Sequence, residues 1–421
     1  MNPGISPAGT GRDRPLAHQA LQDRFELGLN RPICGLALPP REATPVVLDH
    51  REEGAACHAG KDATRCHYLT RVIALIPMDL SPLRRALGAL ANRESLSESQ
   101  TAEVFGIVMS GEATPAQIGA LLMGLRAKGE TAAEVAGAAR ALRDAMVRVT
   151  ASHPHLVDTC GTGGGTVPTF NISTVAAFVA AGAGATVPKH GNRSYTSKCG
   201  SADVLEALGV RIVLDAASAA RVLNEARVVF LFAPSFHPAM KHVGPARREL
   251  GTPSIMNLLG PLANPAGVKR QVIGVAERDR AGVVAEALVR LGAEHALVVH
   301  GRVGMDEISP HGATDVWEVR DGALRTWEID PERYRLSIGD VGVLQGGEPA
   351  ANAERLERIL ANGSGDPPGL AAVLLNAGAA IYVAGIAGSL AEGIGRAREV
   401  VASGAARAAL DRLRKASASI S

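Results

Sequence analysis

The stretch 155–165 reads HLVDTCGTGGG, a short apolar run that leads directly into a glycine-rich loop. A few residues later NIST, at 171–174, opens an Ala-rich segment. A strand, a glycine loop and a helix start in this order are the parts of an anion cradle. Glycine lets the backbone approach a ligand, consecutive amides form a nest for phosphate oxygens, and a helix N-terminus adds free N–H groups. The stretch therefore predicts binding of a phosphorylated small molecule, with an ordinary tight turn as the alternative.

Beyond this loop, short apolar runs alternate with amphipathic segments, which is typical of an α/β unit with a largely parallel sheet. We expect strands at 155–159, 185–188, 227–232, 271–276 and 295–300. We expect helices at 171–183, 201–208, 216–226 and 281–292. The alternating stretch 315–330 contains an Asp-Gly pair and predicts a hairpin. From about 352 to 416 the chain becomes helical again, and these helices should pack on the sheet or on the N-terminal helices.

The segment before the loop predicts a small all-helical domain over 78–150, completed by later helices. Its helices are expected near 80–92, 97–110, 115–128 and 131–148. Thr114, Thr131 and Ser81 (the last followed by a proline) have the residue types of helix N-caps. The predicted fold class is therefore α/β: a small all-helical N-terminal domain and a larger α/β domain over 151–421 with a mostly parallel central sheet.

Residues 1–77 look unlike the rest, because they are rich in Pro and Arg and show no sustained helical period. We expect a disordered extension or an over-long translation, with the folded chain beginning near Met78. Cys57-His58 and Cys66-His67 superficially resemble metal ligands, but their spacing fits no common zinc pattern.

Composition limits the classes of function. The 421 residues carry a net charge of +2, and only 3% are aromatic. A nucleic-acid surface needs basic patches or exposed aromatic residues, so we expect no nucleic-acid partner. No apolar run reaches the length of a membrane span and no secretory signal is seen, so we expect a cytoplasmic protein without membrane contact. An odd, sparse set of cysteines indicates reduced thiols: Cys34, Cys57, Cys66, Cys160 and Cys199.

Charged residues after the glycine loop are candidate ligand contacts. Lys189 follows a strand and Arg193 lies four residues on, so two cations around Gly191 suit a turn that wraps phosphate oxygens. The alternative is a solvated basic loop. Asp306 and Glu307 can reach one metal ion together only from a loop, and Mg²⁺ binds through one or two carboxylates, water and substrate phosphates. We expect a magnesium pair, the alternative being a solvated acidic turn.

Further charged and imidazole side chains are open to more than one reading. A planar guanidinium matches an aromatic carboxylate, but the sequence alone does not choose between Arg247 and Arg248. His190 has the chemistry of a general base, yet we expect it to pack or to form a local hydrogen bond. His237 and His242 lie five residues apart, which is wrong for a helical metal pair, and we assign them to pocket shape or packing.

Four segments together resemble the phosphoribosyl diphosphate site of the anthranilate phosphoribosyltransferase family. They read GTGGGTVPTFNIST at 161–174, KHGNRSYTSKCGSADVLEALG at 189–209, NLLGPLANP at 257–265 and GMDE at 304–307. The resemblance runs from about Met78 to the end. It implies a fold like that of nucleoside phosphorylases and related phosphoribosyltransferases. It also implies a homodimer that uses Mg²⁺ to transfer a phosphoribosyl group from 5-phosphoribosyl 1-diphosphate to anthranilate, a step of tryptophan biosynthesis that releases pyrophosphate.

The resemblance also implies which residues contact each ligand. For the sugar diphosphate they are Gly161, Gly164, Gly165, Thr169, Asn171, Ile172, Ser173, Thr174, Lys189, His190, Gly191, Asn192, Arg193, Ser194, Tyr195, Thr196, Ser197 and Ser201. For anthranilate they are Gly161, Asn192 and Arg247, and for magnesium Ser173, Asp306 and Glu307. Helix capping is the alternative role of Ser173. The family usually has Asp where this chain has Gly165, which removes any side-chain role there but leaves the backbone cradle.

Such a transfer needs no strong base, because a neutral aromatic amine is already nucleophilic. Alignment of the substrates and stabilisation of the leaving group agree with the lack of an acid–base pair in these motifs. Cys160 and Cys199 have no assigned base, so neither is expected to act as a nucleophile. Two alternatives stay open: a pyrimidine nucleoside phosphorylase-like enzyme, and a non-catalytic relative that binds nucleic acid. Arg247 and the acidic pair favour the transferase, and the nearly neutral charge speaks against the nucleic-acid binder.

Overall fold

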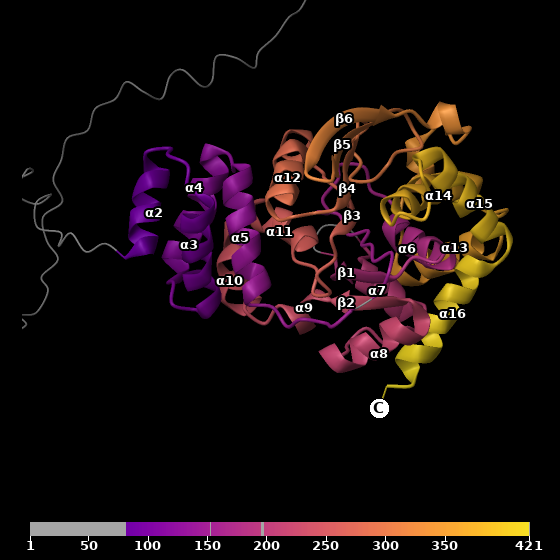
Figure 1. The fold of residues 1–421 in the computed structure, drawn as a ribbon, viewed down its shortest axis with the longest axis horizontal. Coiled ribbons are helices and arrows are strands. Elements are labelled where there is room, and N and C mark those ends of the chain that lie inside the picture. Colours follow the sequence, from indigo (N-terminus) through magenta and orange to yellow (C-terminus); the bar gives the residue numbers. More distant parts are fainter. Residues whose placement is uncertain (1–80, 152, 195–197, 421) are drawn as a thin grey trace, which may run out of the picture. The chain divides into compact units, whose positions relative to one another are not determined.

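The computed structural model of the chain describes residues 81–151, 153–194 and 198–420. The expectations for residues 1–77, including the two Cys-His pairs, lie outside these ranges. The described part begins with helices that no strand interrupts (Figure 1). They are α2 Pro82–Ala91, α3 Glu98–Ser110, α4 Pro115–Lys128 and α5 Ala132–Asp144.

Local side-chain hydrogen bonds set where these helices begin. Thr114 and Thr131 each accept the backbone N–H of the third helical residue, and Gln117 and Glu134 complete two capping boxes. Both expected N-caps are therefore confirmed. Ser81 stands at the N-cap position of α2, but its side chain makes no capping hydrogen bond.

The end of α5 differs from the expected helix 131–148. The helix stops at Asp144, and the Val147 N–H instead donates to the Phe236 carbonyl oxygen at 2.8 Å. A backbone group that is paired across the chain in this way cannot also continue the helical ladder.

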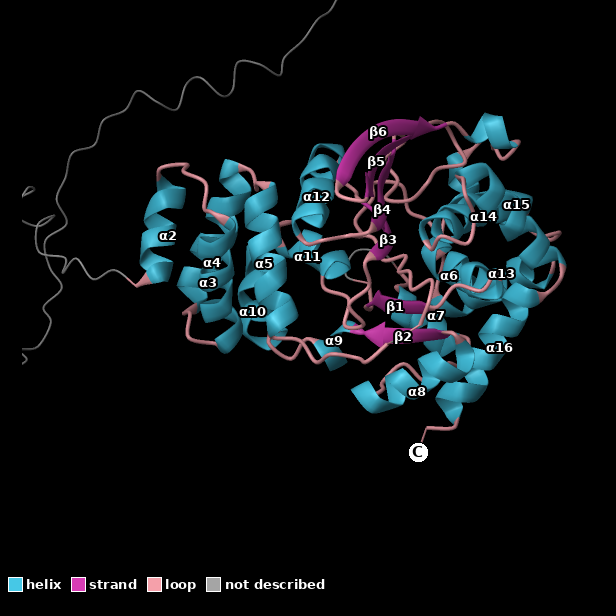
Figure 2. Ribbon diagram, in the orientation of Figure 1, coloured by secondary structure: helices cyan, strands magenta, loops and turns pink. Residues whose placement is uncertain are grey.

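The rest of the described chain alternates helices with strands (Figure 2). Its first half contains α6 Ile172–Gly182, β1 Val187–Gly191, α7 Ser201–Ala207, α8 Ala216–Ala226, β2 Val228–Phe232, α9 Ala233–Phe236, α10 Met240–Leu250 and α11 Met256–Leu262. Its second half contains β3 Arg270–Gly274, α12 Arg278–Arg290, β4 His295–Gly301, β5 Thr314–Arg320, β6 Ala323–Ile329, α13 Pro349–Ala361, α14 Pro367–Val383, α15 Leu390–Ala402 and α16 Ala405–Ala418, with 3₁₀ turns at Pro331–Tyr334 and Val341–Leu344.

The strands form two sheets, the two-stranded β1–β2 and the four-stranded β3–β4–β5–β6. β1 pairs with β2 and β3 with β4 in parallel, whereas β4, β5 and β6 are antiparallel, which confirms the hairpin. The expected strand 155–159 is wrong as a full strand, because it forms only two isolated parallel bridges. It stops at Asp158, whose side chain, rather than a backbone carbonyl, accepts the N–H groups of Thr159 and His190.

Helices cover both faces of the sheet. Successive residues of a strand point to opposite faces: Ile273 and Val298 pack in one hydrophobic cluster with α12 and the N-terminal helices, while Val272 and Leu297 pack in another with α6 and α14. Helices α10, α11 and α12 also contact the helices of the N-terminal bundle. The predicted class, a helical bundle beside an α/β unit, is confirmed.

Several candidate ligand loops follow the carboxyl ends of parallel strands in the two sheets. The carboxyl ends of β1, β3 and β4 lead into residues 192–194, 275–277 and 302–307, and open α/β sheets bind ligands beyond these ends. Among the helices of the described ranges, none combines the length and apolar character required to cross a bilayer.

Candidate active site

The glycine loop after Asp158 is shaped by close backbone contacts and open space. The Thr162 N–H donates to the Gly274 carbonyl oxygen at 2.8 Å, and a Cβ at Gly161 would lie 3.0 Å from the same oxygen. Gly163 and Gly164 have φ values of 68° and 86°, and a Cβ at either position would meet no atom within 4 Å. Glycine adopts this left-handed backbone freely, so the loop presents main-chain groups on an open side.

The start of α6 follows this loop and is tied to its neighbours through Asn171. The Asn171 side chain donates to the Cys199 carbonyl oxygen and accepts from Asn352 Nδ2. Thr169 lies half-buried just before it. Ile172 is fully buried and its N–H already donates within the backbone, so the expectation that it contacts a ligand is not supported by its position.

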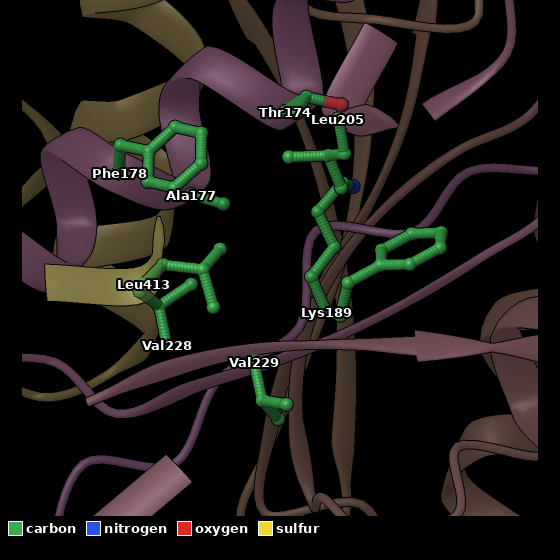
Figure 3. A pocket seen from close by; sticks show the side chains of 9 residues that line it. Thr174, Ala177, Phe178, Lys189, Leu205, Val228, Val229 and Leu413 are labelled. Carbon is green, nitrogen blue, oxygen red and sulfur yellow. The ribbon is translucent and has the colours of Figure 1, made fainter. Parts of the chain in front are cut away.

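Lys189 is a buried cation in the middle of β1. Its Nζ donates to the carbonyl oxygen and Oγ1 of Thr159 at 3.2 and 3.3 Å and to Ser173 Oγ at 3.4 Å. Its methylene chain lines a cavity of about 10 Å³, opposite Phe178 and near Thr174 (Figure 3). Apolar walls around the stem therefore hold the ammonium group beside Ser173. Thr174 is buried in the wall of this cavity.

Arg193 points away from Lys189. Its guanidinium forms ion pairs with Asp203 and Glu206 of α7 at 2.7 and 2.6 Å, and it lies over the ring of Phe232. The expected turn in which Arg193 and Lys189 wrap one anion is therefore absent from this arrangement, because the acids of α7 already neutralise the guanidinium.

Other residues of the segment 189–201 contact the first turn of α7. A Cβ at Gly191 would lie so close to Ser201 Oγ, at 2.4 Å, that only glycine fits there. Ser201 Oγ donates to the Asn192 carbonyl oxygen, and the Ser194 N–H donates to Asp203. The remaining predicted contacts, Tyr195, Thr196 and Ser197, lie outside the described residues.

Asp306 lies in the turn after β4, against the glycine loop. Its carboxylate accepts from the N–H groups of Gly163 and Gly165, while burial raises its pKa above the usual range. A Cβ at Gly165 would come within 2.6 Å of Asp306 Oδ1. The glycine at 165 therefore makes room for an acid that arrives from another part of the chain.

Glu307 faces the start of α6. Burial and the charge of Asp306 raise the pKa of Glu307 to about 8, whereas Lys189 and the hydrogen bonds from Ser173 oppose the shift. Ser173, Asp306 and Glu307, predicted from separate segments, thus come together from a helix start and a turn.

The imidazole groups of His190 and His237 are buried with their ring centroids 5.1 Å apart. Burial lowers the pKa of His190 to about 3 and that of His237 to about 4, so both rings are neutral near pH 7. His190 Nδ1 bonds to the Gly260 carbonyl oxygen at 3.0 Å. The prediction that His190 forms a local hydrogen bond is confirmed.

Two further expectations concern α10 and the cysteines. On α10, Arg247 is half-buried and Arg248 is exposed. The two arginines therefore differ in solvent exposure, which the sequence alone did not reveal. Burial raises the pKa of Cys160 to about 12 and that of Cys199 to about 11. Both remain thiols at neutral pH, which agrees with the expectation that neither is a nucleophile.

Sequence reasoning missed a buried pair behind these loops, Asp158 and Asn264. Asn264 Nδ2 donates to Asp158 Oδ2 at 2.7 Å and to the Pro188 carbonyl oxygen at 2.8 Å. Both side chains are almost fully buried. The only signal in the sequence is a lone acid in an otherwise apolar run, and it does not reveal a partner 106 residues away.

Comparisons with known proteins agree with this architecture. Residues 84–146 match the helical bundle domain of a glycosyl transferase family, and residues 153–407 match the a/b domain of that family. The anthranilate phosphoribosyltransferase of Roseiflexus castenholzii is 50% identical over 341 residues, covering 79% of this chain and 97% of that protein. That of Laribacter hongkongensis is 48% identical over 331 residues, covering 78% and 96%.

Solved structures give the same result. The crystal structure of anthranilate phosphoribosyltransferase from Thermus thermophilus has a TM-score of 0.75 and 42% identity, and the match covers 79% of this chain and 99% of that one. The Saccharomyces cerevisiae enzyme in complex with PRPP and Mg has a TM-score of 0.74 and 29% identity, with coverage of 80% and 98%. From the fold, the site and these relatives together, the chain belongs to the anthranilate phosphoribosyltransferase family.

Proposed function

We propose that this chain transfers the phosphoribosyl group of 5-phosphoribosyl 1-diphosphate to the amine of anthranilate, forming N-(5-phosphoribosyl)anthranilate and pyrophosphate in tryptophan biosynthesis. The observation that carries the proposal is the convergence of the glycine loop, Lys189, Ser173 and the Asp306-Glu307 turn at the carboxyl ends of the sheet. Relatives with this activity in their names cover four-fifths of the chain.

The geometry suits stabilisation of a leaving diphosphate. The amine nitrogen attacks the anomeric carbon, the bond from that carbon to the diphosphate oxygen breaks, and its electron pair leaves with pyrophosphate. Lys189 Nζ, held beside Ser173, and the amide of Gly164 can meet the growing negative charge. The nitrogen of the first product is a strongly acidic arylammonium, so it loses its proton to water without a dedicated base.

The oxygen atoms around Ser173 fit magnesium. Glu307 is a half-buried carboxylate whose pKa is raised to about 8, and Asp306 is its neighbour. In the described ranges, no group of three or more His, Cys, Asp or Glu side chains converges. We propose that these two acids and the Ser173 hydroxyl hold Mg²⁺ together with substrate oxygens, as is usual for this ion. When bound, the ion neutralises charge on the leaving diphosphate.

For the acceptor, we propose that Arg247 binds the anthranilate carboxylate and that Asn192 and Gly161 contact its ring. Arg247 is the less exposed of the two arginines on α10. A guanidinium can donate two parallel hydrogen bonds to a carboxylate. The neutral rings of His190 and His237 add no positive charge that would oppose the charge developing on the amine nitrogen as it attacks.

We also propose a cytoplasmic homodimer that assembles through the N-terminal helices. Between α2 and α3 lies a groove of about 120 Å³, lined by Ala86, Leu96 and Val104 with Arg85, Gln100 and Glu103 at its border. The proposal rests on the family resemblance, and a twofold contact would use the same surface of both copies. Light scattering on the purified chain tests this proposal, and a monomer at micromolar concentration contradicts it.

The decisive assay follows the loss of anthranilate fluorescence. Turnover should require both 5-phosphoribosyl 1-diphosphate and Mg²⁺. Cleavage of a pyrimidine nucleoside by inorganic phosphate, without anthranilate turnover, would instead assign the phosphorylase-like alternative. A salt-dependent mobility shift of DNA without either activity would assign the nucleic-acid binder.

A further inference from the structure

The backbone ladder between residues 155–158 and β1 breaks at a defined rung. The Val157 N–H donates to the Thr186 carbonyl oxygen at 3.0 Å, as a parallel ladder requires. The next donor on β1 would be the N–H of residue 188, but Pro188 has none. The next acceptor, the Pro188 carbonyl oxygen, is bound by Asn264 Nδ2 instead of a strand N–H.

Asp158 completes the replacement of this rung. Its Oδ1 accepts the N–H of Thr159 at 2.7 Å and the N–H of His190 at 3.3 Å, and its Oδ2 accepts from Asn264. Asn264 Oδ1 in turn accepts the Ala266 N–H at 2.8 Å. The two side chains therefore satisfy buried backbone groups that the sheet would otherwise pair, and leaving such groups unpaired is costly.

The position of this pair is what connects it with the reaction. Thr159 begins the glycine loop, and His190 lies in β1, two residues before Asn192 of the loop that follows this strand. A single carboxylate oxygen thus bonds the backbone at the start of the glycine loop and near the end of β1. Lys189 reaches back across the same gap to the Thr159 carbonyl oxygen at 3.2 Å, so its ammonium depends on the same spacing.

Neighbouring groups also stabilise the ionised form of the Asp158 carboxylate. Burial raises its pKa to about 6, whereas Lys189, Asn264 and the two backbone donors oppose the shift. The carboxyl group is therefore ionised near pH 7 and accepts all three hydrogen bonds.

We infer that Asp158, oriented by Asn264, is a positioning residue of phosphoribosyl transfer: the pair replaces one rung of the sheet and sets the separation between the glycine loop and the end of β1, from which residues 192–194 continue. This inference rests on the proposed function. It assigns Asp158 no contact with substrate, and its effect passes through the backbone of Thr159 and His190.

The experiment compares Asp158→Asn with the exchange variant Asp158→Asn/Asn264→Asp. In the single variant the new amide opposes the Asn264 amide, donor against donor, so one bond is lost. In the exchange variant the amide at 158 donates to the carboxylate at 264, while its oxygen still accepts from the backbone. The carboxylate at 264 cannot donate to the Pro188 carbonyl oxygen as Asn264 does, so the rescue is expected to be partial. We expect kcat of the single variant to fall about 100-fold, the effect of small misplacement of reacting groups, with a raised KM for 5-phosphoribosyl 1-diphosphate. The exchange should recover about tenfold of the loss.

Glu318→Gln is the matched control. Glu318 is also a buried carboxylate with three donors, His295 Nε2, Trp327 Nε1 and the Tyr382 hydroxyl, but it belongs to β5 and contacts neither ligand loop. The Glu318→Gln variant should have a lower melting temperature than the wild type but the same kcat and KM. If the wild type and this control both convert anthranilate, the proposed function holds, whatever the result for the Asp158 variants.

Three results would overturn the inference. The first is a folded Asp158→Asn variant with the kcat and KM of an active wild type. The second is a folded exchange variant no better than the single variant. If Asp158→Asn does not fold, Asn264→Ala decides, because it leaves both backbone bonds of Asp158 in place. A reduced kcat for Asn264→Ala, with the melting temperature of the control, supports the inference, and an unchanged kcat is the third overturning result.

Discussion

The carboxylate of Asp306 occupies the space that a side chain at position 165 would need: a Cβ there would lie 2.6 Å from Asp306 Oδ1 and 3.1 Å from the Asp306 backbone nitrogen. The absence of a side chain thus has a steric role, because it lets the turn that follows β4 close on the glycine loop.

This contact predicts a coupled effect on stability. Gly165→Ala should lower the free energy of unfolding by about 1–3 kcal/mol, since the added methyl group overpacks against Asp306. In an Asp306→Ala background the same substitution should cost clearly less, because the clashing oxygen is gone. Urea unfolding without magnesium measures both. Gly395→Ala, a helical position with open space, serves as the control, and equal costs in the two backgrounds would contradict the coupling.

The two arginines of α10 predict different kinetics. Arg247→Ala should raise the KM for anthranilate by about tenfold or more, as expected for loss of hydrogen bonds to a charged group, with little effect on the KM for the sugar diphosphate. Arg248→Ala, its exposed neighbour, should behave like the wild type. The fluorescence assay measures both. Equal effects of the two substitutions would remove Arg247 from the acceptor site.

Lys189 offers a test of charge at constant shape. Methionine can keep the apolar stem against the cavity wall formed with Phe178, but it has no ammonium group for Thr159 and Ser173. Lys189→Met should therefore keep its melting temperature within the range of the wild type while kcat falls about 100- to 1000-fold, as on removal of one stabilising donor. A Lys189→Met variant that keeps full kcat refutes a role for this cation in the transfer.

The raised pKa of Glu307 predicts how magnesium binding depends on pH. With a folded-state pKa of about 8, Glu307 is largely protonated at pH 7 without metal, and Mg²⁺ must displace this proton. Affinity should therefore rise between pH 7 and 9, and binding should release protons. Calorimetry in buffers of different ionisation enthalpy measures both. Asp306→Ala/Glu307→Ala should abolish turnover at low magnesium, and an unchanged magnesium dependence argues against the site.

The raised pKa of Glu307 also predicts how the stability of the fold changes with pH. A carboxyl group whose folded-state pKa lies above its unfolded value stabilises the fold most below the unfolded pKa, and this contribution is lost as the pH rises through the folded one. Metal-free protein should therefore lose stability between about pH 4 and pH 8 through Glu307, and Glu307→Gln should flatten that part of the profile. Thermal melts across the pH range test this, and an identical slope in the variant contradicts it.

A shortened chain tests the proposed start of the folded part. We expect a chain that begins at Met78 to match the full chain in melting temperature and kcat, because the match to the helical bundle domain begins at residue 84 and the curated relatives cover about four-fifths of this chain. A large loss of either property would assign residues 1–77 a role in the fold or the reaction.

The sequence by itself determined the order of the elements, the capping residues Thr114 and Thr131, and the residue types of the ligand loops. These features depend on contacts within a few residues, such as the i to i+3 bonds of a capping box. For the same reason it predicted a hairpin at 315–330 and a helix start after the glycine loop.

Only the tertiary structure decided which of these residues meet. It turned Arg193 toward Asp203 and Glu206, buried Ile172, closed Asp306 on Gly165, and joined Asp158 to Asn264 across 106 residues. The physical reason is that side-chain pairing over such separations depends on how sheet and helices pack, and a pattern of residue types along the chain carries no record of those distances.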